Sequence, residues 1–255
     1  MLKIIIAAFA AVLFLAPCCR AESRVVTILK AIDANYKMKK DVRADVTLTQ
    51  QRAAQGTKIM QMAYYRRDSD DAFLIAINGP ENEKGNGYLR VGDNFWMYRK
   101  NTRTFQHVNR DESIGGSDAH SDDFETRKLE ELYGPVVDSS GTEKISEEML
   151  GKVPVFKFEI KARVSDVDYP RQIFWTRRDN SLLLKQESYS LSGTLMQTAY
   201  FLKFTEIEGR YVPVKQLFID EFEKGNKTVV EIANMVPGTL DDKIFTKAYL
   251  ENLSK

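Results

Sequence analysis

The chain is dominated by an alternation of apolar and polar residues that begins at Val42 and recurs as far as Met235. Residues 42–48 show it most clearly, because small or branched apolar residues take every second position between charged residues and threonine. A period of two indicates β-strands with one face toward a core and the other toward water. Turn residues at 179–180 and 192–193 separate two of the later segments. The pattern therefore predicts about ten or eleven strands, joined by hairpins into an antiparallel sheet.

A second pattern, with the period of an α-helix, occurs in three short segments. Residues 22–36 carry apolar side chains at every third or fourth position, with polar residues on the opposite face. Residues 124–133 and 240–253 are expected to form two more short helices. No regular succession of strand and long helix is present, which excludes a parallel α/β fold. We therefore predict a mainly β (α+β) protein, a strongly curved antiparallel sheet with short helices over its open side.

Several of the predicted strands are apolar on both faces. Residues 72–77 contain no polar side chain, and residues 95–98 and 199–202 are similar. A sheet with one face in water should alternate, so strands of this kind need cover on both faces. Two interpretations remain open: the side chains fill an ordinary core, or they line a cavity for a fatty ligand. The candidate cavity residues are Met60, Met62, Tyr64, Leu74, Phe95, Trp96, Met97, Tyr98, Phe158, Phe174 and Leu202.

The N-terminal 21 residues have the features of an export signal. Lys3 precedes an unbroken apolar run at residues 4–15, which is too short to span a bilayer, and cleavage is expected after Ala21. The alternative is a lipid anchor at Cys18 or Cys19. Because these are the chain's 2 cysteines, we expect no disulfide in the mature protein, a single domain of residues 22–255.

Charge and candidate chemistry argue for a binding protein. With 37 basic and 36 acidic residues, the chain has no basic excess for nucleic acid. The densest set of potential ligands for a cation lies in one loop, but acids of this spacing more often cap helices or face solvent. With 2 histidines and no nucleophile motif, we predict no metal site, cofactor or catalytic residue. The loop residues concerned are Asp118, His120, Asp122, Asp123 and Glu125.

Three segments of the chain have distinctive sequences. Residues 89–98 read Leu-Arg-Val-Gly-Asp-Asn-Phe-Trp-Met-Tyr, residues 116–118 read Gly-Ser-Asp and are followed by Asp123, and residues 244–250 read Ile-Phe-Thr-Lys-Ala-Tyr-Leu. Each segment resembles a motif of LolA-like proteins, the family that sorts lipoproteins to the outer membrane. The chain departs from the family at positions 119 and 121, where alanine and serine stand in place of the usual aromatic residues.

The resemblance implies an unclosed β-barrel whose helices cover its concave side, with Gly116, Ser117, Asp118 and Asp123 in a lid or loop. It also implies a periplasmic carrier that binds the acyl chains of lipoproteins or lipids and takes them toward the outer membrane. The expected partners are acylated lipoproteins, an inner-membrane ABC-type transporter that releases them and an outer-membrane acceptor. The alternative is a sensor of the same fold that binds lipid or lipoprotein and signals to a membrane partner.

Overall fold

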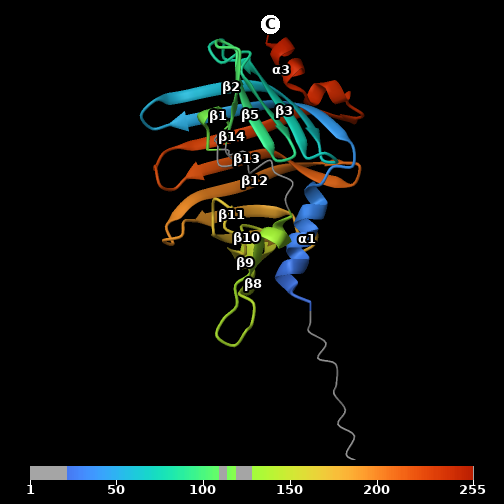
Figure 1. The fold of residues 1–255 in the computed structure, drawn as a ribbon. Coiled ribbons are helices and arrows are strands. Elements are labelled where there is room, and N and C mark those ends of the chain that lie inside the picture. The colour runs from blue at the N-terminus through green and yellow to red at the C-terminus, as the bar shows by residue number, and fades with distance from the viewer. Residues whose placement is uncertain (1–21, 109–113, 119–127, 255) are drawn as a thin grey trace, which may run out of the picture.

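The computed structural model describes residues 22–108, 114–118 and 128–254. These residues form one antiparallel sheet of 14 strands in the order β6-β5-β4-β3-β2-β1-β14-β13-β12-β11-β10-β9-β7, and β8 also pairs with β9 (Figure 1). The sheet is not closed, because β6 lies at one end and β7 and β8 lie at the other. The strands are β1 (Asp41–Arg52), β2 (Gly56–Arg67), β3 (Ala72–Gly79), β4 (Gly87–Val91), β5 (Asn94–Arg99), β6 (Thr104–His107), β7 (Tyr133–Pro135), β8 (Ile145–Leu150), β9 (Val153–Ala162), β10 (Arg171–Arg177), β11 (Leu183–Tyr189), β12 (Leu195–Ile207), β13 (Arg210–Asp220) and β14 (Lys227–Gly238).

The number of strands exceeds the ten or eleven expected, and β7 and β8 lie in a segment without clear alternation. Four of the six residues of β8 are exposed, because this strand pairs with β9 alone at the edge of the sheet. A strand that buries neither face has no reason to alternate. Its sequence therefore carries no signal with a period of two.

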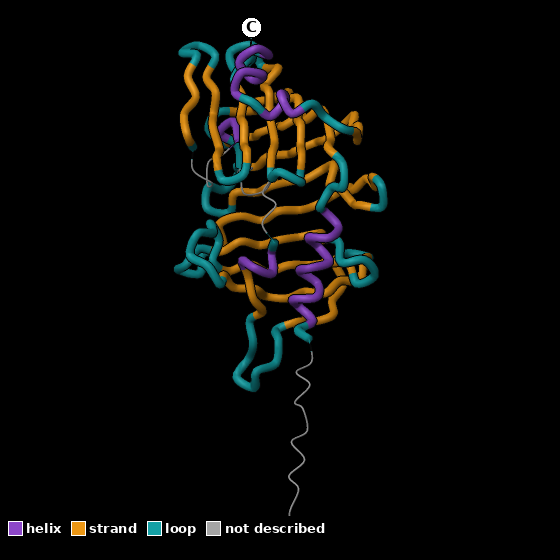
Figure 2. Tube along the Cα trace, turned by 45° about the vertical axis from the view of Figure 1, so that its right-hand side comes forward, coloured by secondary structure: helices purple, strands orange, loops and turns teal. Residues whose placement is uncertain are grey.

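The helix α1 (Arg24–Tyr36) covers one face of the sheet, which we call the inner face. The Ser23 side chain accepts a hydrogen bond from the N–H of Val26 and so caps the helix. The buried side chains of α1 pack against Phe158 and Phe174, on β9 and β10. The buried residues of the helix are Val25, Ile28, Leu29 and Ile32. Figure 2 shows α1 and the C-terminal helices in different parts of the sheet.

The C-terminal segment covers the opposite side of the sheet, which we call the outer face. The 3-10 helix η3 (Asp242–Phe245) and the helix α3 (Lys247–Leu253) pack over β2, β3, β4 and β5. In β3, Phe73 and Ile75 face inward and Leu74 faces the C-terminal helices, so the strand is apolar on both sides. A side chain at Gly87 would collide with Leu250 of α3, so glycine permits this close packing.

The short helix α2 (Leu129–Leu132) precedes β7. It falls within the helix expected at residues 124–133, of which residues 124–127 lie outside the described residues. Among the described residues, no helix has the length and apolar character that crossing a bilayer requires.

Candidate ligand cavity

A cavity of about 470 Å³ lies between the inner face of the sheet and the helices α1 and α2. Its size is within the range of about 300–1,000 Å³ that is usual for small-molecule sites. Ala34 and Lys37 of the α1 end and Lys128 before α2 are exposed and border it. Most of the lining is apolar and comes from the two helices and eight strands, of which β2 and β7 contribute Tyr64 and Tyr133. The other apolar lining residues include Ile32, Val42, Leu129, Leu132, Phe174, Leu183, Phe201, Val212, Phe218, Ile232 and Met235.

A partly buried ion pair fixes the end of α1 beside this cavity. Arg66, on β2, donates to both carboxylate oxygens of Asp68 at 2.5 and 2.8 Å. It also donates to the carbonyl oxygen of Tyr36, the last residue of α1, at 3.0 Å. Asp68 in turn accepts from the N–H of Met38 at 2.7 Å. One charged pair therefore holds the C-terminal end of the covering helix onto the sheet.

A second carboxylate, that of Asp33 on α1, joins the two covering helices. It lines the cavity and accepts a hydrogen bond from the N–H of Leu129, the first residue of α2, at 2.9 Å. Burial raises the pKa of Asp33 to about 7, and the nearby Glu130 acts in the same direction. The N–H of Leu129 and the charge of Lys128 act in the opposite direction. Asp33 therefore titrates near neutral pH, in the contact between α1 and α2.

We expect the Asp33→Asn variant to lose part of the pH dependence of stability. The folded protein binds the Asp33 proton more tightly than the unfolded chain, whose aspartates titrate near about pH 4. The wild-type free energy of unfolding should therefore fall as pH rises from about 4 to about 7. Urea unfolding at about pH 5 and pH 8 measures this loss, which should be smaller in the variant. The exposed Asp70 serves as a control, and an Asp70→Asn effect of equal size would contradict the assignment.

The structure separates the candidate cavity residues into four locations. Tyr64 and Phe174 line the cavity. Met62 lines a separate small apolar void of about 20 Å³, which Tyr64 also borders. Phe158 is buried beneath α1. On the inner face but away from the cavity, the packed core includes Met60, Phe95 and Met97. Leu74, Trp96 and Tyr98 lie on the outer face, and Leu202 is exposed.

The outer-face residues do not line the cavity, and the physical reason is strand alternation. Trp96 follows Phe95 along β5 and therefore points to the opposite side, where α3 places Lys247 4.1 Å from its ring. Leu202 follows Phe201 at a shift in the pairing register of β12 with β13, and it is exposed and does not line the cavity. For these two pairs, the neighbouring residue in the sequence is the one that faces inward.

The segment 114–118 crosses the inner face above the cavity. Ile114 is almost completely buried in the inner-face core, between β1, β2 and β4. The N–H of Gly115 donates to the Tyr88 hydroxyl at 2.9 Å, and Gly115 has a φ of 64°. A side chain at Gly115 would also collide with Met60, so glycine lets the segment lie close to the sheet.

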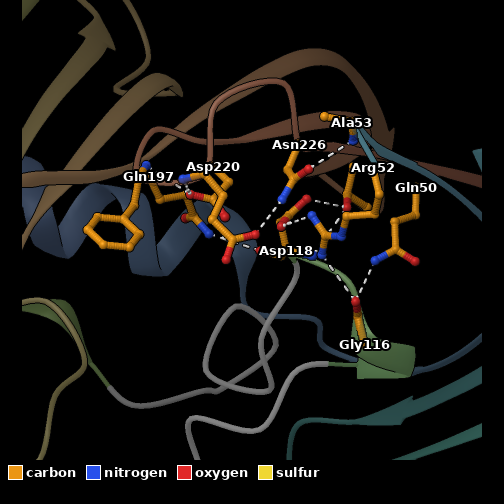
Figure 3. A network of polar contacts seen from close by, with 11 residues as sticks. Gln50, Arg52, Ala53, Gly116, Asp118, Gln197, Asp220 and Asn226 are labelled. Atoms are coloured by element: carbon orange, nitrogen blue, oxygen red, sulfur yellow. Dashed lines mark hydrogen bonds and ion pairs between the residues drawn. The ribbon is translucent and has the colours of Figure 1, made fainter. Parts of the chain in front are cut away.

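A buried network fixes the end of this segment (Figure 3). Arg52 donates to Asp118 at 2.5 Å and to the carbonyl oxygen of Gly116 at 3.1 Å. The hydroxyl of Thr228 donates to the other Asp118 oxygen at 2.8 Å, and Gln197 donates to the Asp118 carbonyl at 2.9 Å. Asp118 therefore joins three strands, β1 and β14 through its carboxylate and β12 through its main-chain carbonyl.

This geometry corrects the interpretation of Asp118 as a solvated loop acid, whereas the lid role of the loop, which includes Asp123 outside the described residues, stays a prediction. Gly116 has its carbonyl hydrogen-bonded to Gln50 and Arg52, and Ser117 and Asp118 are buried. Ile114, Ser117 and Asp118 are thus packed into the sheet. Of the candidate cation ligands, Asp118 is paired with Arg52, and the other four (His120, Asp122, Asp123 and Glu125) lie outside the described residues. The described residues hold no group of three or more potential metal ligands.

Solved structures of similar fold come from several bacteria. A LolA superfamily protein from Nitrosomonas europaea matches 88% of this chain and 97% of its own, with a TM-score of 0.71 and 20% identity. A domain described as an outer membrane lipoprotein-sorting protein from Vibrio parahaemolyticus matches 89% and 97%, with a TM-score of 0.76 and 17% identity. A DUF1329 family protein from Desulfovibrio piger matches 88% and 97%, with a TM-score of 0.76 and 18% identity.

These likenesses define the class by its fold: the chain has the curved, unclosed sheet found in the solved LolA superfamily structure, and the predicted fold is confirmed. The chain belongs to the family whose model matches residues 69–252, a family described as an uncharacterized protein. No curated protein matches the chain.

Proposed function

We propose that this protein is a periplasmic carrier that binds the acyl chain of a lipid or lipoprotein in the cavity under α1. The observation that carries the proposal is the cavity of about 470 Å³ with its mainly aliphatic and aromatic lining. Each methylene group that moves from water into such a lining contributes about 0.8 kcal/mol. Binding by burial needs no catalytic group, so we propose a non-enzymatic role.

The likeness to lipoprotein-sorting structures and the apolar segment at residues 4–15 support a role outside the cytoplasm. We propose that cargo comes from an inner-membrane ABC-type transporter and passes to an outer-membrane acceptor. The polar groups at the cavity, Asp33 and Lys37 among them, would face the polar part of the cargo. The Arg66–Asp68 pair and the Asp33 contact would keep α1 and α2 over the acyl chain.

Ligand binding should raise the melting temperature. A ligand at about 100 times its dissociation constant adds about 2.7 kcal/mol to the free energy of unfolding, which is several degrees for a domain of this size. We expect this shift with long-chain fatty acids and with a synthetic triacylated lipopeptide, and none with the matching unacylated peptide. Tryptophan emission is a poor readout, because neither Trp96 nor Trp175 lines the cavity. Equal melting temperatures with and without the acylated ligands would contradict the proposal.

A further inference from the structure

Three neighbouring connections at one end of the sheet each present one exposed apolar side chain. They join β9 to β10, β11 to β12 and β13 to β14, and we call this end the apical end. Val164, Leu191 and Phe222 are 38%, 92% and 68% exposed, respectively. The hairpins that carry Leu191 and Phe222 project on the left side of the sheet in Figure 1.

The connections at the opposite ends of the same strands lack this feature, and the exposed Val236 and Met149 on that side lie within the strands β14 and β8. The connection from β10 to β11 contains the polar residues 178–181 and the buried Leu182, and β12 joins β13 through Glu208 and Gly209. None of these residues is an exposed large apolar side chain. Single exposed apolar residues are common on protein surfaces, but a succession of three at one end of a sheet is not random scatter.

Hydrogen bonds within the two hairpins that carry Leu191 and Phe222 fix the shape of their tips. In the first hairpin, Ser190 and Thr194 close the turn through two hydrogen bonds of 2.9 and 3.1 Å, with Leu191 between them. In the second, Asp220 accepts from the N–H groups of Phe222 and Glu223 at 2.9 and 2.7 Å. Both tips are thus preorganised with their apolar residue in solvent, which lowers the entropic cost of binding.

We propose that the apical end is a membrane-docking site, at which Leu191 and Phe222 enter the interfacial region of a lipid bilayer. A protein partner normally requires a contiguous buried patch of about 800 Å² on each side. Here the apolar side chains stand on separate tips with serine, glycine and charged residues around them. A bilayer surface has no fixed shape and accepts separate protruding side chains.

One of the three apical connections also borders the cavity. The connection from β9 to β10, which carries Val164, also lines the cavity through Val167, Asp168 and Tyr169. Docking by the apical end would therefore place one side of the cavity beside the bilayer. The docking proposal itself does not depend on which ligand the cavity holds.

Vesicle flotation tests the proposal with the chain from Glu22 onward. This form contains every described helix and strand and lacks the apolar residues 4–15, which would bind vesicles by themselves. We expect it to float with phosphatidylethanolamine vesicles, with or without phosphatidylglycerol. The variant L191S/F222S should bind at least about tenfold more weakly. Because insertion is apolar, added salt should change binding little.

The matched control is V236S/M149S, which removes two apolar side chains that are 60% and 59% exposed on β14 and β8. It should float like the wild type, and all three proteins should melt at the same temperature. The proposal is overturned if the wild type does not float, or if L191S/F222S floats as well as the control. Flotation that salt abolishes and L191S/F222S retains would also overturn it, because charged groups would then carry the binding.

Discussion

The Phe201→Ser variant should bind long-chain acyl ligands at least about tenfold more weakly than the wild type, since burying a large apolar side chain contributes about 1.5–3 kcal/mol. Phe201 lines the cavity from β12 and contacts the inner-face core on one side and the cluster under α1 on the other. Isothermal titration calorimetry with a fatty acid or an acylated lipopeptide measures the loss directly.

Leu202 provides the matched control, because it is the next residue of the same strand but is exposed and does not line the cavity. The Leu202→Ser variant removes a similar apolar side chain and should bind with unchanged affinity. Since Phe201→Ser also disturbs packing, its melting temperature must be recorded, and titration must be performed well below it. Equal affinities of the two variants would show that the acyl chain does not occupy the cavity.

The second large effect is expected at Asp118. The Asp118→Asn variant leaves Arg52 without its charged partner in a buried network, which should cost about 3 kcal/mol of stability. For a domain of this size the melting temperature should fall by roughly 6–12 °C. Urea unfolding and differential scanning calorimetry measure the two quantities.

An exposed pair of the same chemistry serves as the control. Arg177 donates to both oxygens of Asp179 at 3.1 and 2.7 Å, but on the surface. Asp179→Asn should cost less than about 1 kcal/mol. A double variant of Arg52→Gln with Asp118→Asn should be destabilised by less than the sum of its single changes, since the two residues share one network. Additive effects, or a loss at Asp118 no larger than at Asp179, would contradict the assigned role.

The sequence predicts the strands, but it does not predict which face of each doubly apolar strand points inward. In β1, apolar and polar residues alternate regularly, and the side chains of Val42 and Leu48 both lie on the inner face. In β5, both faces are apolar because α3 covers the outer one, so Phe95 and Trp96 look equivalent in the sequence. Residues paired across neighbouring strands share a face of the sheet. Knowledge of the strand pairing would therefore show, starting from β1, which residues of β5 face inward.

The polar part of the site is harder to predict because its partners are distant in the chain. Asp118 lies 66 residues from Arg52 and 110 from Thr228, and no local pattern signals either contact. In the sequence, Asp33 is a polar residue on the solvent-facing side of a helix, but in the structure it is partly buried and bonded to the N–H of Leu129 of α2. Arg66 and Asp68 are close in sequence, yet they read as a charged turn. In each case tertiary packing determines the role of the side chain.

The most direct test of the acyl-carrier account is mass spectrometry of the lipid that accompanies the purified protein. Native spectra should show a mass increment on the folded chain, and extraction should release a molecule with a long acyl chain. The Leu202→Ser protein should carry the same molecule, and the Phe201→Ser protein should carry much less of it. A wild-type protein that is free of acyl lipid after expression and also fails to take up added fatty acid or lipopeptide would contradict the account.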